Sequence, residues 1–310
     1  MRIQKIAELC GYEFCGLDCD IKNLSYADTA SEDSLAIIHT QKEFSSTNAE
    51  AVLMEPRFIK TDKTILLVSD PLDVAAVKIA MLLVQNGEAK LYSRNVYSNI
   101  NGFYIADNVM IGEGTDISPN VFIDEDVKIG KHCWIEPNVQ IKGGSVIGDE
   151  VHLMSGCIIG ADSFCHYYDT ELRTFPGIGK VVIGDRTQIG CHTVIQRGTF
   201  SDTLIGSGNR IGNLVDIGHD VWIGDNCKIV SQTGIASRVC IGNMVEIYGQ
   251  TGIANYVTIG DRAVIMAQSL VTKSITAGER VSGRYARKHS DALRKQVEMN
   301  KMCEVRTWEQ

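Results

Sequence analysis

The amino-acid sequence predicts a mainly β protein whose central domain is a triangular parallel β-helix, a prism built of short strands. Two observations predict this fold: an aliphatic residue recurs at every sixth position, and glycine, asparagine or aspartate is frequent between these positions. A period of six fits neither an α-helix, with about 3.6 residues per turn, nor a plain strand, with a period of about two. Six residues can form one strand and one corner, and three such units close a triangular coil.

The repeat begins at Ile105 and continues to Ile265 with two breaks. Of its 24 positions, 23 are isoleucine and the other is Leu153. β-branched side chains at a fixed period can stack inside a prism as ladders that run from coil to coil. Because three units make one coil, we expect about eight coils and, at a strand spacing of roughly 4.8 Å, a prism about 38 Å long.

The two breaks in the repeat are candidates for the functional site, because loops that leave a rigid scaffold tend to carry function. The first is Gly160–Gly179, which contains several aromatic residues, and the second is a slip of the period at Gln196–Thr203. We expect both segments to leave the prism wall as loops.

The flanking residues lack the period of six. Before the prism, the sequence predicts a small α/β domain with helices at 3–10 and 72–85 and apolar runs at 35–39, 51–54 and 64–68. After it, Ser290 is a suitable N-cap for a helix that runs to about Met302. The predicted domains are the α/β domain (1–96), the β-helix (97–277) and a C-terminal helical extension (278–310).

Composition argues against several classes of protein. The chain is 44% hydrophobic and 22% charged, as globular proteins are, and its apolar runs are too short to span a membrane. The N-terminus has no secretory signal pattern, so we expect a cytoplasmic protein. Ten cysteines scattered over 310 residues do not make a disulfide framework, and Cys10, Cys15 and Cys19 contain no zinc-type pair.

Charge is unevenly distributed along the chain. The net charge of −8 disfavours a general nucleic-acid binder. Residues 280–310, however, hold eight basic and four acidic side chains, a local charge of +4, which leaves −12 for the rest of the chain. This basic tail is a candidate docking surface for an acidic partner or for a phosphate group.

Several motifs resemble one known family, the UDP-3-O-acylglucosamine N-acyltransferases of lipid A synthesis. The similarity covers most of the chain. It is carried by Gly160-Ala161-Asp162-Ser163-Phe164, Ile178–Asp185, Arg197-Gly198, Asp202-Thr203, Asn213, Ile217-Gly218-His219 and Ile223–Asn226. The resemblance implies left-handed coils, a homotrimer with its sites between subunits, a uridine-binding N-terminal domain and a basic C-terminal helix that binds acyl carrier protein. It implies no metal and no permanently bound cofactor.

The resemblance also implies roles for individual residues, with His219 as the catalytic base. We expect the substrate to contact Arg197, Asp202, Asn213, Asp216 and Tyr256 on the prism, and Gln41 and Phe44 in the N-terminal domain. We expect Arg284, Arg287 and Lys288 to bind phosphate, either of a carrier-protein pantetheine arm or of coenzyme A. The sequence departs from the family at Gln196 (usually aspartate), Gly212 (usually acidic), Tyr256 (usually histidine) and the Ile38/Phe44 pair (usually two aromatics), which leaves the sugar and the nucleotide open.

The chemistry needs few groups. An amine attacks a thioester carbonyl, a base takes a proton, and N–H donors stabilise the oxyanion. Histidine suits the base at neutral pH, and the substrate amine is itself the nucleophile. Asp202, Asp216 and Asp220 are alternative carboxylate partners for the histidine, the backbone at Gly234 or Gly252 could supply the oxyanion hole, and Met266 and Leu270 either line an acyl groove or pack in the core.

The sequence therefore predicts an N-acyltransferase that moves an acyl group, a 3-hydroxyacyl chain from acyl carrier protein, to the amine of a nucleotide-linked aminosugar. The alternative is a coenzyme-A-dependent N-acyl- or N-acetyltransferase that acts on a nucleotide aminosugar for surface polysaccharide. A zinc carbonic anhydrase on the same scaffold is disfavoured, because His132, His152, His192 and His219 lack the pairing that a three-histidine site requires. A purely structural β-helix would not explain the two breaks.

Overall fold

In the part of the chain that the structure describes, the N-terminal domain is a five-stranded sheet with three helices. The computed structural model describes residues 1–310 except 56–62, 93–96, 169, 284–293, 296 and 299–310. The sheet has the order β1-β5-β4-β3-β2, and β1 alone runs antiparallel to its neighbour. The elements are α1 (Ile3–Cys10), β1 (Glu13–Cys15), β2 (Asn23–Tyr26), β3 (Ser34–Ile37), α2 (Gln41–Ser46), β4 (Ala51–Met54), β5 (Thr64–Leu67) and α3 (Leu72–Gln85).

Local sequence signals explain the helices of this domain. The predicted bounds of α1 and α3 are confirmed, and α1 ends where Gly11 adopts the left-handed conformation with φ 71°. Helix α2 was not predicted, because none of its residues is buried and it therefore lacks a strong apolar period. It is instead started by a capping box, in which Thr40 accepts from the Glu43 amide and the Glu43 carboxylate accepts from the Thr40 amide.

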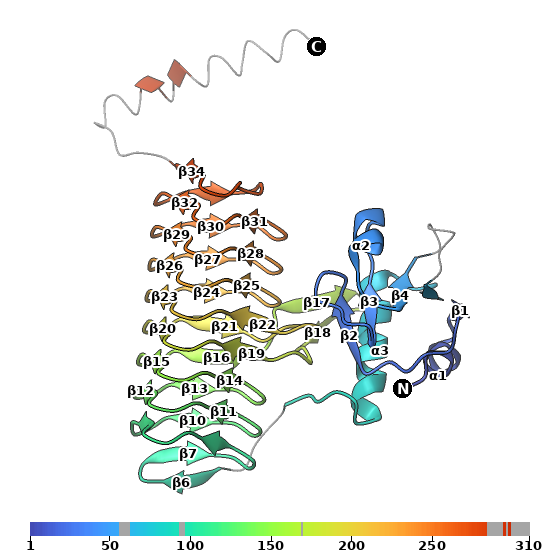
Figure 1. Ribbon diagram of the computed structural model, residues 1–310, viewed down its shortest axis with the longest axis horizontal. Helices are drawn as coiled ribbons and strands as arrows, with labels where there is room; N and C mark the ends of the chain where they lie inside the picture. Colours follow the sequence, from blue (N-terminus) through green and yellow to red (C-terminus); the bar gives the residue numbers. More distant parts are fainter. Residues whose placement is uncertain (56–62, 93–96, 169, 284–293, 296, 299–310) are drawn as a thin grey trace.

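The prism has three faces, which we name by their number of strands (Figure 1). Apart from the antiparallel pair β6–β7, all pairing within them is parallel. The ten-stranded face consists of β6 (Ser98–Ile100), β7 (Phe103–Ile105), β10 (Phe122–Ile123), β13 (Gln140–Ile141), β16 (Ile158–Ala161), β21 (Val194–Gln196), β24 (Asp216–Ile217), β27 (Gly234–Ile235), β30 (Gly252–Ile253) and β33 (Leu270–Val271).

The other two faces complete each coil. The eight-stranded face consists of β8 (Met110–Ile111), β11 (Lys128–Ile129), β14 (Val146–Ile147), β19 (Val181–Ile183), β22 (Thr203–Ile205), β25 (Trp222–Ile223), β28 (Cys240–Ile241) and β31 (Thr258–Ile259). The nine-stranded face consists of β9 (Asp116–Ile117), β12 (Trp134–Ile135), β15 (His152–Leu153), β20 (Gln188–Ile189), β23 (Arg210–Ile211), β26 (Lys228–Ile229), β29 (Glu246–Ile247), β32 (Val264–Ile265) and β34 (Arg280–Val281).

The isoleucine ladders form the core of the prism, as predicted. Every repeat position from Ile123 to Ile265 is buried, and the ladder residues of successive coils pair directly, such as Ile217 with Ile235. The first three positions are less covered: Ile105 and Ile117 are half-buried, and Ile111 is 39% exposed, because it lies in the first coil with no coil beyond it. The faces hold eight to ten strands, so the prism is slightly longer than predicted. Strand β34 carries it past residue 277, where we had placed its end.

The corners require left-handed backbone, and most are not glycine. Positive φ recurs three residues after a ladder isoleucine, at residues as different as Asp220, Arg238 and Tyr256. We expected mainly glycine, asparagine and aspartate there. His132 and His192 are corner residues with φ 54°, whereas His152 lies on the nine-stranded face, where its ring stacks on Trp134.

The first break is not a loop but a β-hairpin. Its strands β17 (Cys165–Tyr168) and β18 (Leu172–Phe175) pair antiparallel and extend from the prism toward the N-terminal domain (Figure 1). Phe175 packs into the core of that domain, so the hairpin helps to join the two units. Most of the predicted C-terminal helix lies outside the described residues. No helix within the described ranges is long and apolar enough to cross a membrane.

Candidate active site at the docking edge

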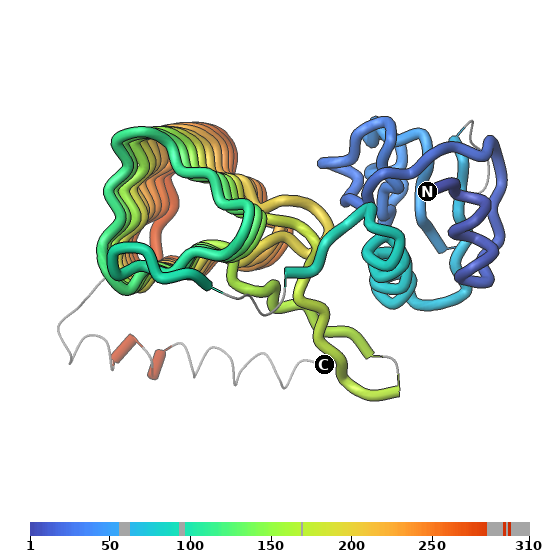
Figure 2. Tube along the Cα trace, turned by 90° about the horizontal axis from the view of Figure 1, so that it is seen from below, coloured from blue at the N-terminus to red at the C-terminus, as the bar shows by residue number. Residues whose placement is uncertain are grey.

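One edge of the prism collects both breaks and the N-terminal domain. We call it the docking edge; it comprises the turns from the ten-stranded to the eight-stranded face at 106–109, 124–127, 142–145, 162–180, 197–202, 218–221, 236–239 and 254–257. Figure 2 looks along the prism and shows the N-terminal domain beside this one corner of the stacked coils. The Ser201 hydroxyl joins the two units, since it accepts from the Tyr26 amide at 3.2 Å and lies 2.7 Å from Thr29 Oγ1.

His219 lies on this edge with a carboxylate partner. Its Nδ1 is 2.7 Å from Asp220 Oδ2 and 3.0 Å from Thr199 Oγ1. The His219 side chain is 14% exposed and that of Asp220 only 2%. Of the three carboxylates left open by the sequence, the structure thus brings Asp220, and neither Asp202 nor Asp216, into hydrogen-bond contact with the imidazole.

Asp220 is held by three further hydrogen bonds. Its carboxylate accepts from the backbone amides of Thr199 and Ser201, each at 3.0 Å, and its own amide donates to Thr203 Oγ1 at 2.9 Å. Because a carboxylate only accepts, the imidazole places its proton on Nδ1 toward Asp220. The lone pair is then on Nε2, the nitrogen that a general base needs.

The slip of the period at 196–203 forms the loop that holds the Asp220 carboxylate in place. Gly198 allows the loop to fold back tightly: a Cβ at this position would lie 1.5 Å from the Ser201 carbonyl oxygen. The fold-back aims the amides of Thr199 and Ser201 at Asp220. A break in the period thereby builds the anchor of the His219–Asp220 pair.

Arg197 does not reach the surface, contrary to its predicted contact with substrate. It is 2% exposed, and its guanidinium donates to the carbonyls of Gly160, Gly179 and Gly143 at 3.2–3.4 Å. These carbonyls belong to both ends of the hairpin insertion and to the preceding turn. Arg197 therefore organises the base of the hairpin, and burial lowers the pKa of its guanidinium.

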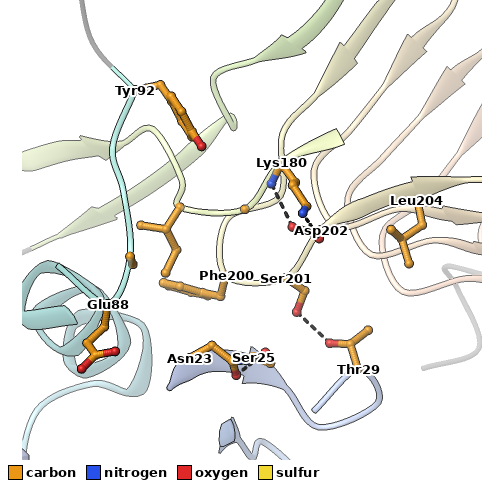
Figure 3. Close-up of a pocket in the computed structure, with 13 residues that line it drawn as sticks. Asn23, Ser25, Thr29, Glu88, Tyr92, Lys180, Phe200, Ser201, Asp202 and Leu204 are labelled. Carbon is orange, nitrogen blue, oxygen red and sulfur yellow. Dashed lines mark hydrogen bonds and ion pairs between the residues drawn. The ribbon is translucent and has the colours of Figure 1, made fainter. Parts of the chain in front are cut away.

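Asp202 lines a cavity of about 500 Å³ between the prism and the N-terminal domain. Figure 3 shows Lys180 and Asp202 on the prism side and Asn23, Ser25 and Thr29 on the domain side. Asp202 Oδ1 accepts from the Lys180 amide at 3.0 Å, and burial raises the pKa of the Asp202 carboxyl. The cavity is polar and large enough for part of a sugar nucleotide.

The ten-stranded face presents a different surface beside His219. Asp216 points outward from β24, where burial raises the pKa of its carboxyl and a hydrogen bond from Gln196 lowers it. The next two coils have Gly234 and Gly252 in the same outward column, followed by Leu270, which is 78% exposed. A Cβ on Gly234 would meet nothing within 4 Å, and a Cβ on Gly252 would meet only Leu270 Cδ1, at 3.5 Å. The two glycines therefore leave a strip of the face without side chains, the bare track, which ends at Leu270.

Asn213 lies elsewhere, in the turn between the nine-stranded and ten-stranded faces. Its Oδ1 accepts from the Cys191 amide at 2.8 Å, which links two successive coils. The structure does not bring Asn213 to the docking edge. Its observed contact is with the backbone of the prism.

Sequence reasoning missed Arg238, which contacts Tyr256 and approaches α2, the helix that carries Gln41 and Phe44. Tyr256 lies one coil beyond it on the docking edge, and the guanidinium carbon of Arg238 is 4.9 Å from the Tyr256 ring centroid. Gln41 and Phe44 lie on α2; Gln41 is exposed, whereas Phe44 packs partly against the domain core. Glu43 of the same helix approaches Arg238. The period could have found Arg238, which follows Asp220 by one full coil in the corner column.

Three predicted donor contacts, Arg284, Arg287 and Lys288, lie outside the described residues. Met266 is half-buried next to Ile265 of the nine-stranded face, away from the glycine track. Among the residues that the structure describes, no three His, Cys, Asp or Glu side chains are grouped so that they could hold a metal ion.

Comparison with known proteins identifies relatives of this chain. Residues 126–163 and 202–237 match the family model described as bacterial transferase hexapeptide (six repeats), which indicates the left-handed coil that the resemblance implied. A UDP-3-O-acylglucosamine N-acyltransferase from Campylobacter lari is 40% identical over 242 residues, which are 73% of this chain and 75% of that protein. A protein of the same name from Rhizobium meliloti is 54% identical over 50 residues, 16% of this chain and 14% of the relative.

Solved structures share the prism. The UDP-N-acetylglucosamine O-acyltransferase from Moraxella catarrhalis aligns with a TM-score of 0.53 and 26% identity, covering 64% of this chain and 77% of that one. The UDP-N-acetylglucosamine acyltransferase from Bacteroides fragilis aligns with a TM-score of 0.54 and 26% identity, covering 64% and 78%.

Proposed function

This chain belongs to the UDP-3-O-acylglucosamine N-acyltransferase family, and we propose that it transfers a 3-hydroxyacyl group from acyl carrier protein to the amine of a UDP-linked, 3-O-acylated glucosamine. Family membership makes it an acyltransferase. The observation that carries the proposal is the anchored His219–Asp220 pair on the docking edge, beside a domain that can bind the nucleotide.

The geometry supports His219 as the general base. As the neutral amine of the sugar attacks the thioester carbonyl, Nε2 takes the proton that the nitrogen must lose, and collapse of the tetrahedral intermediate expels the carrier thiolate. Asp220 orients the ring through Nδ1 and stabilises the imidazolium that forms. The thiolate then regains a proton, from the imidazolium or from solvent, so that the enzyme returns to its starting state.

The two other requirements of the reaction have candidate groups nearby. The bare track formed by Gly234 and Gly252 gives an acyl chain flat access to the prism wall beside the His219 corner. The amides of Gly234 and Gly252 donate to the carbonyls of Thr251 and Ser269 at 2.9 Å, so the expectation that they form the oxyanion hole is wrong. The cavity lined by Lys180, Asp202 and Asn23 offers charged and amide groups to a sugar or a phosphate. The chemistry needs no metal and no permanently bound cofactor.

A homotrimer is part of this proposal. The outward residues of the eight-stranded face are mostly apolar, and Met110 and Trp222 are 62% and 44% exposed. The nine-stranded face instead presents charged side chains such as Arg210, Lys228 and Glu246. Because the eight-stranded face is apolar and adjoins the docking edge, it fits a subunit interface that completes the site. Sedimentation of an active monomer would contradict it, and Trp222→Glu should weaken the trimer.

The activity test is a direct product assay. Purified protein is incubated with UDP-3-O-acylglucosamine and 3-hydroxyacyl carrier protein, and mass spectrometry follows acylation of the amine. UDP-N-acetylglucosamine, which lacks a free amine, is the matched control and should not react. Acetyl- or short acyl-coenzyme A is offered as the competing donor. Outright preference for coenzyme A would exclude the carrier-protein donor and favour the polysaccharide aminosugar reaction.

The basic tail separates the two donors further. A carrier protein is acidic and needs an extended basic surface, whereas coenzyme A needs only a few cations. Reversal of Arg287, Lys288 and Arg294 to glutamate should therefore raise KM for the carrier-protein donor while kcat stays nearly constant. The same variant should scarcely change KM for a short acyl-coenzyme A. Equal changes of KM for both donors would show that the basic tail is not a specific binding surface for the carrier protein.

A further inference from the structure

A buried arginine whose Nη1 lacks a hydrogen-bond partner lies one coil beyond the His219–Asp220 pair. Arg238 occupies the same corner column as Asp220, with φ 57°, and its amide donates to the His219 carbonyl at 3.1 Å. Its side chain is 9% exposed. Within the described part of the chain, Arg238 Nη1 is the one buried side-chain nitrogen or oxygen that lacks a hydrogen-bond partner.

The surroundings of the guanidinium hold it in place but leave Nη1 without an acceptor. Its central carbon is 3.7 Å from the Tyr26 ring centroid and 4.9 Å from that of Tyr256, so both rings make cation–π contacts. Nη2 is 3.7 Å from Asp28 Oδ1 and 4.0 Å from Glu43 Oε1. Both distances exceed those of hydrogen bonds.

Burial of the Arg238 guanidinium costs free energy unless a partner accepts a hydrogen bond from Nη1. Withdrawing a cation from water without giving it hydrogen bonds is unfavourable, and buried donors in folded proteins nearly always find an acceptor. The planar fork of an arginine matches the oxygens of phosphate and carboxylate groups. Rings and distant carboxylates fix the plane of Arg238, and the vacant Nη1 faces no acceptor of the described protein. A phosphate or carboxylate oxygen of a ligand would supply the missing acceptor.

We propose that Arg238 binds a phosphate oxygen of the nucleotide diphosphate through Nη1. This inference rests on the proposed function. The nucleotide is favoured over the phosphate of a pantetheine arm, because Tyr26, Asp28 and Glu43 all belong to the N-terminal domain, and Glu43 lies on α2 with the predicted nucleotide contacts. Tyr256 is 64% exposed, so rotation of this one ring can open the guanidinium to the ligand without disturbing the core.

The same geometry gives Arg238 a specificity role. A phosphate bound there would lie one coil from His219, so the position of the diphosphate would set how far the sugar amine extends toward Nε2. Arg238 thereby determines which sugar nucleotides place an amine at the base. A ligand that lacks the diphosphate loses this anchor, whatever its base or sugar.

The test compares UDP with uridine, which differ by the diphosphate alone. Binding of each to Arg238→Met is measured by calorimetry, with Arg262→Met as the matched control, because Arg262 is an exposed corner arginine with φ 59° on another edge. A charge-assisted hydrogen bond is worth about 1.5–3 kcal/mol, so UDP affinity should fall roughly 10- to 100-fold in Arg238→Met. Uridine affinity should not change, Arg262→Met should bind both like the wild type, and Arg238→Lys should recover part of the loss.

Each other outcome is decisive. Equal UDP affinity in wild type and Arg238→Met overturns the inference alone. Parallel loss of UDP and uridine, with a lower melting temperature of the ligand-free variant, makes Arg238 a clamp between the two units and also overturns it. A loss confined to coenzyme A or 4′-phosphopantetheine assigns the residue to the donor instead. A wild-type protein that binds neither UDP nor uridine overturns the proposed function and, with it, this inference.

Discussion

Replacing Asp220 with asparagine tests the hydrogen bonds of the site. One of the two carboxylate oxygens, which both accept, then becomes an NH2 group, which donates. Oδ2 of the carboxylate faces both His219 Nδ1 and the Thr199 amide, whereas Oδ1 faces only the Ser201 amide. An NH2 at the Oδ2 position would meet the Thr199 amide, a second donor, and would force the imidazole proton onto Nε2. An NH2 at the Oδ1 position would meet only the donor at Ser201. The second orientation should therefore be adopted.

This choice fixes the expected magnitudes. One buried amide loses its acceptor, which costs about 1–3 kcal/mol of the free energy of unfolding. His219 keeps its tautomer but faces a neutral acceptor, and because a charge-assisted bond is roughly twice as strong as a neutral one, kcat should fall only about tenfold. Asp220→Ala removes every contact of the carboxylate, so kcat of this variant should fall about 10²-fold or more.

The assay measures kcat with the carrier-protein donor and the denaturation midpoint for wild type, Asp220→Asn, Asp220→Ala and His219→Ala. Activity should decrease in that order, and all variants should remain folded. A folded Asp220→Asn enzyme as inactive as His219→Ala would mean that the amide had turned its NH2 to the imidazole, which refutes the reasoning. Full activity of Asp220→Asn would remove Asp220 from the mechanism.

Three further predictions concern the scaffold. Ile217→Ala in the centre of the ladder should lower the free energy of unfolding by about 2–5 kcal/mol in a denaturant titration, whereas Ile111→Ala at the open end should cost less than half as much; equal losses would contradict the ladder as the core. Gly198→Ala should unfold the slip and abolish activity, because its Cβ would lie 1.5 Å from a carbonyl oxygen; a stable, active variant would show that the fold-back is not needed. The Lys78 ammonium, followed by a tyrosine hydroxyl, lowers the pKa of Asp70 below 3.8. That contribution to stability is present above pH 3.8 and lost as pH falls through the lowered pKa. The free energy of unfolding of Asp70→Asn should therefore fall less steeply than that of the wild type as the pH drops below 3.8. An unchanged pH dependence would contradict the pairing.

The prism was predictable because each coil repeats one physical rule. Isoleucine at every sixth position has only one way to be buried, namely in the ladders that Ile217 and its neighbours form. Helix α3 was predictable from its apolar pattern for the same reason. Elements that bury little were missed: α2 depends on the capping box at Thr40, and the hairpin β17–β18 depends on pairing between residues with no clear alternation.

The site could be predicted only in part. The motif and its off-ladder position pointed to His219, but three carboxylates were equivalent in sequence. Asp220 is the partner because Gly198 folds the slip back over it, a contact that no spacing reveals. Arg197 looked like a substrate contact but is used inside the hairpin base. Arg238 was overlooked because its significance comes from Tyr26 and Glu43, which are distant in the chain.

The central claim is that Nε2 of His219 takes the proton of a sugar amine during acyl transfer. The most direct measurement is the single-turnover rate of amide formation on UDP-3-O-acylglucosamine by wild type and by His219→Ala, each checked to be a folded trimer by sedimentation. Loss of a general base usually costs 10²–10⁴-fold, so the variant should form N-acylated product about a hundred times more slowly or worse. A folded variant that keeps more than roughly a tenth of the wild-type rate would contradict the account, since general-base loss costs more than that.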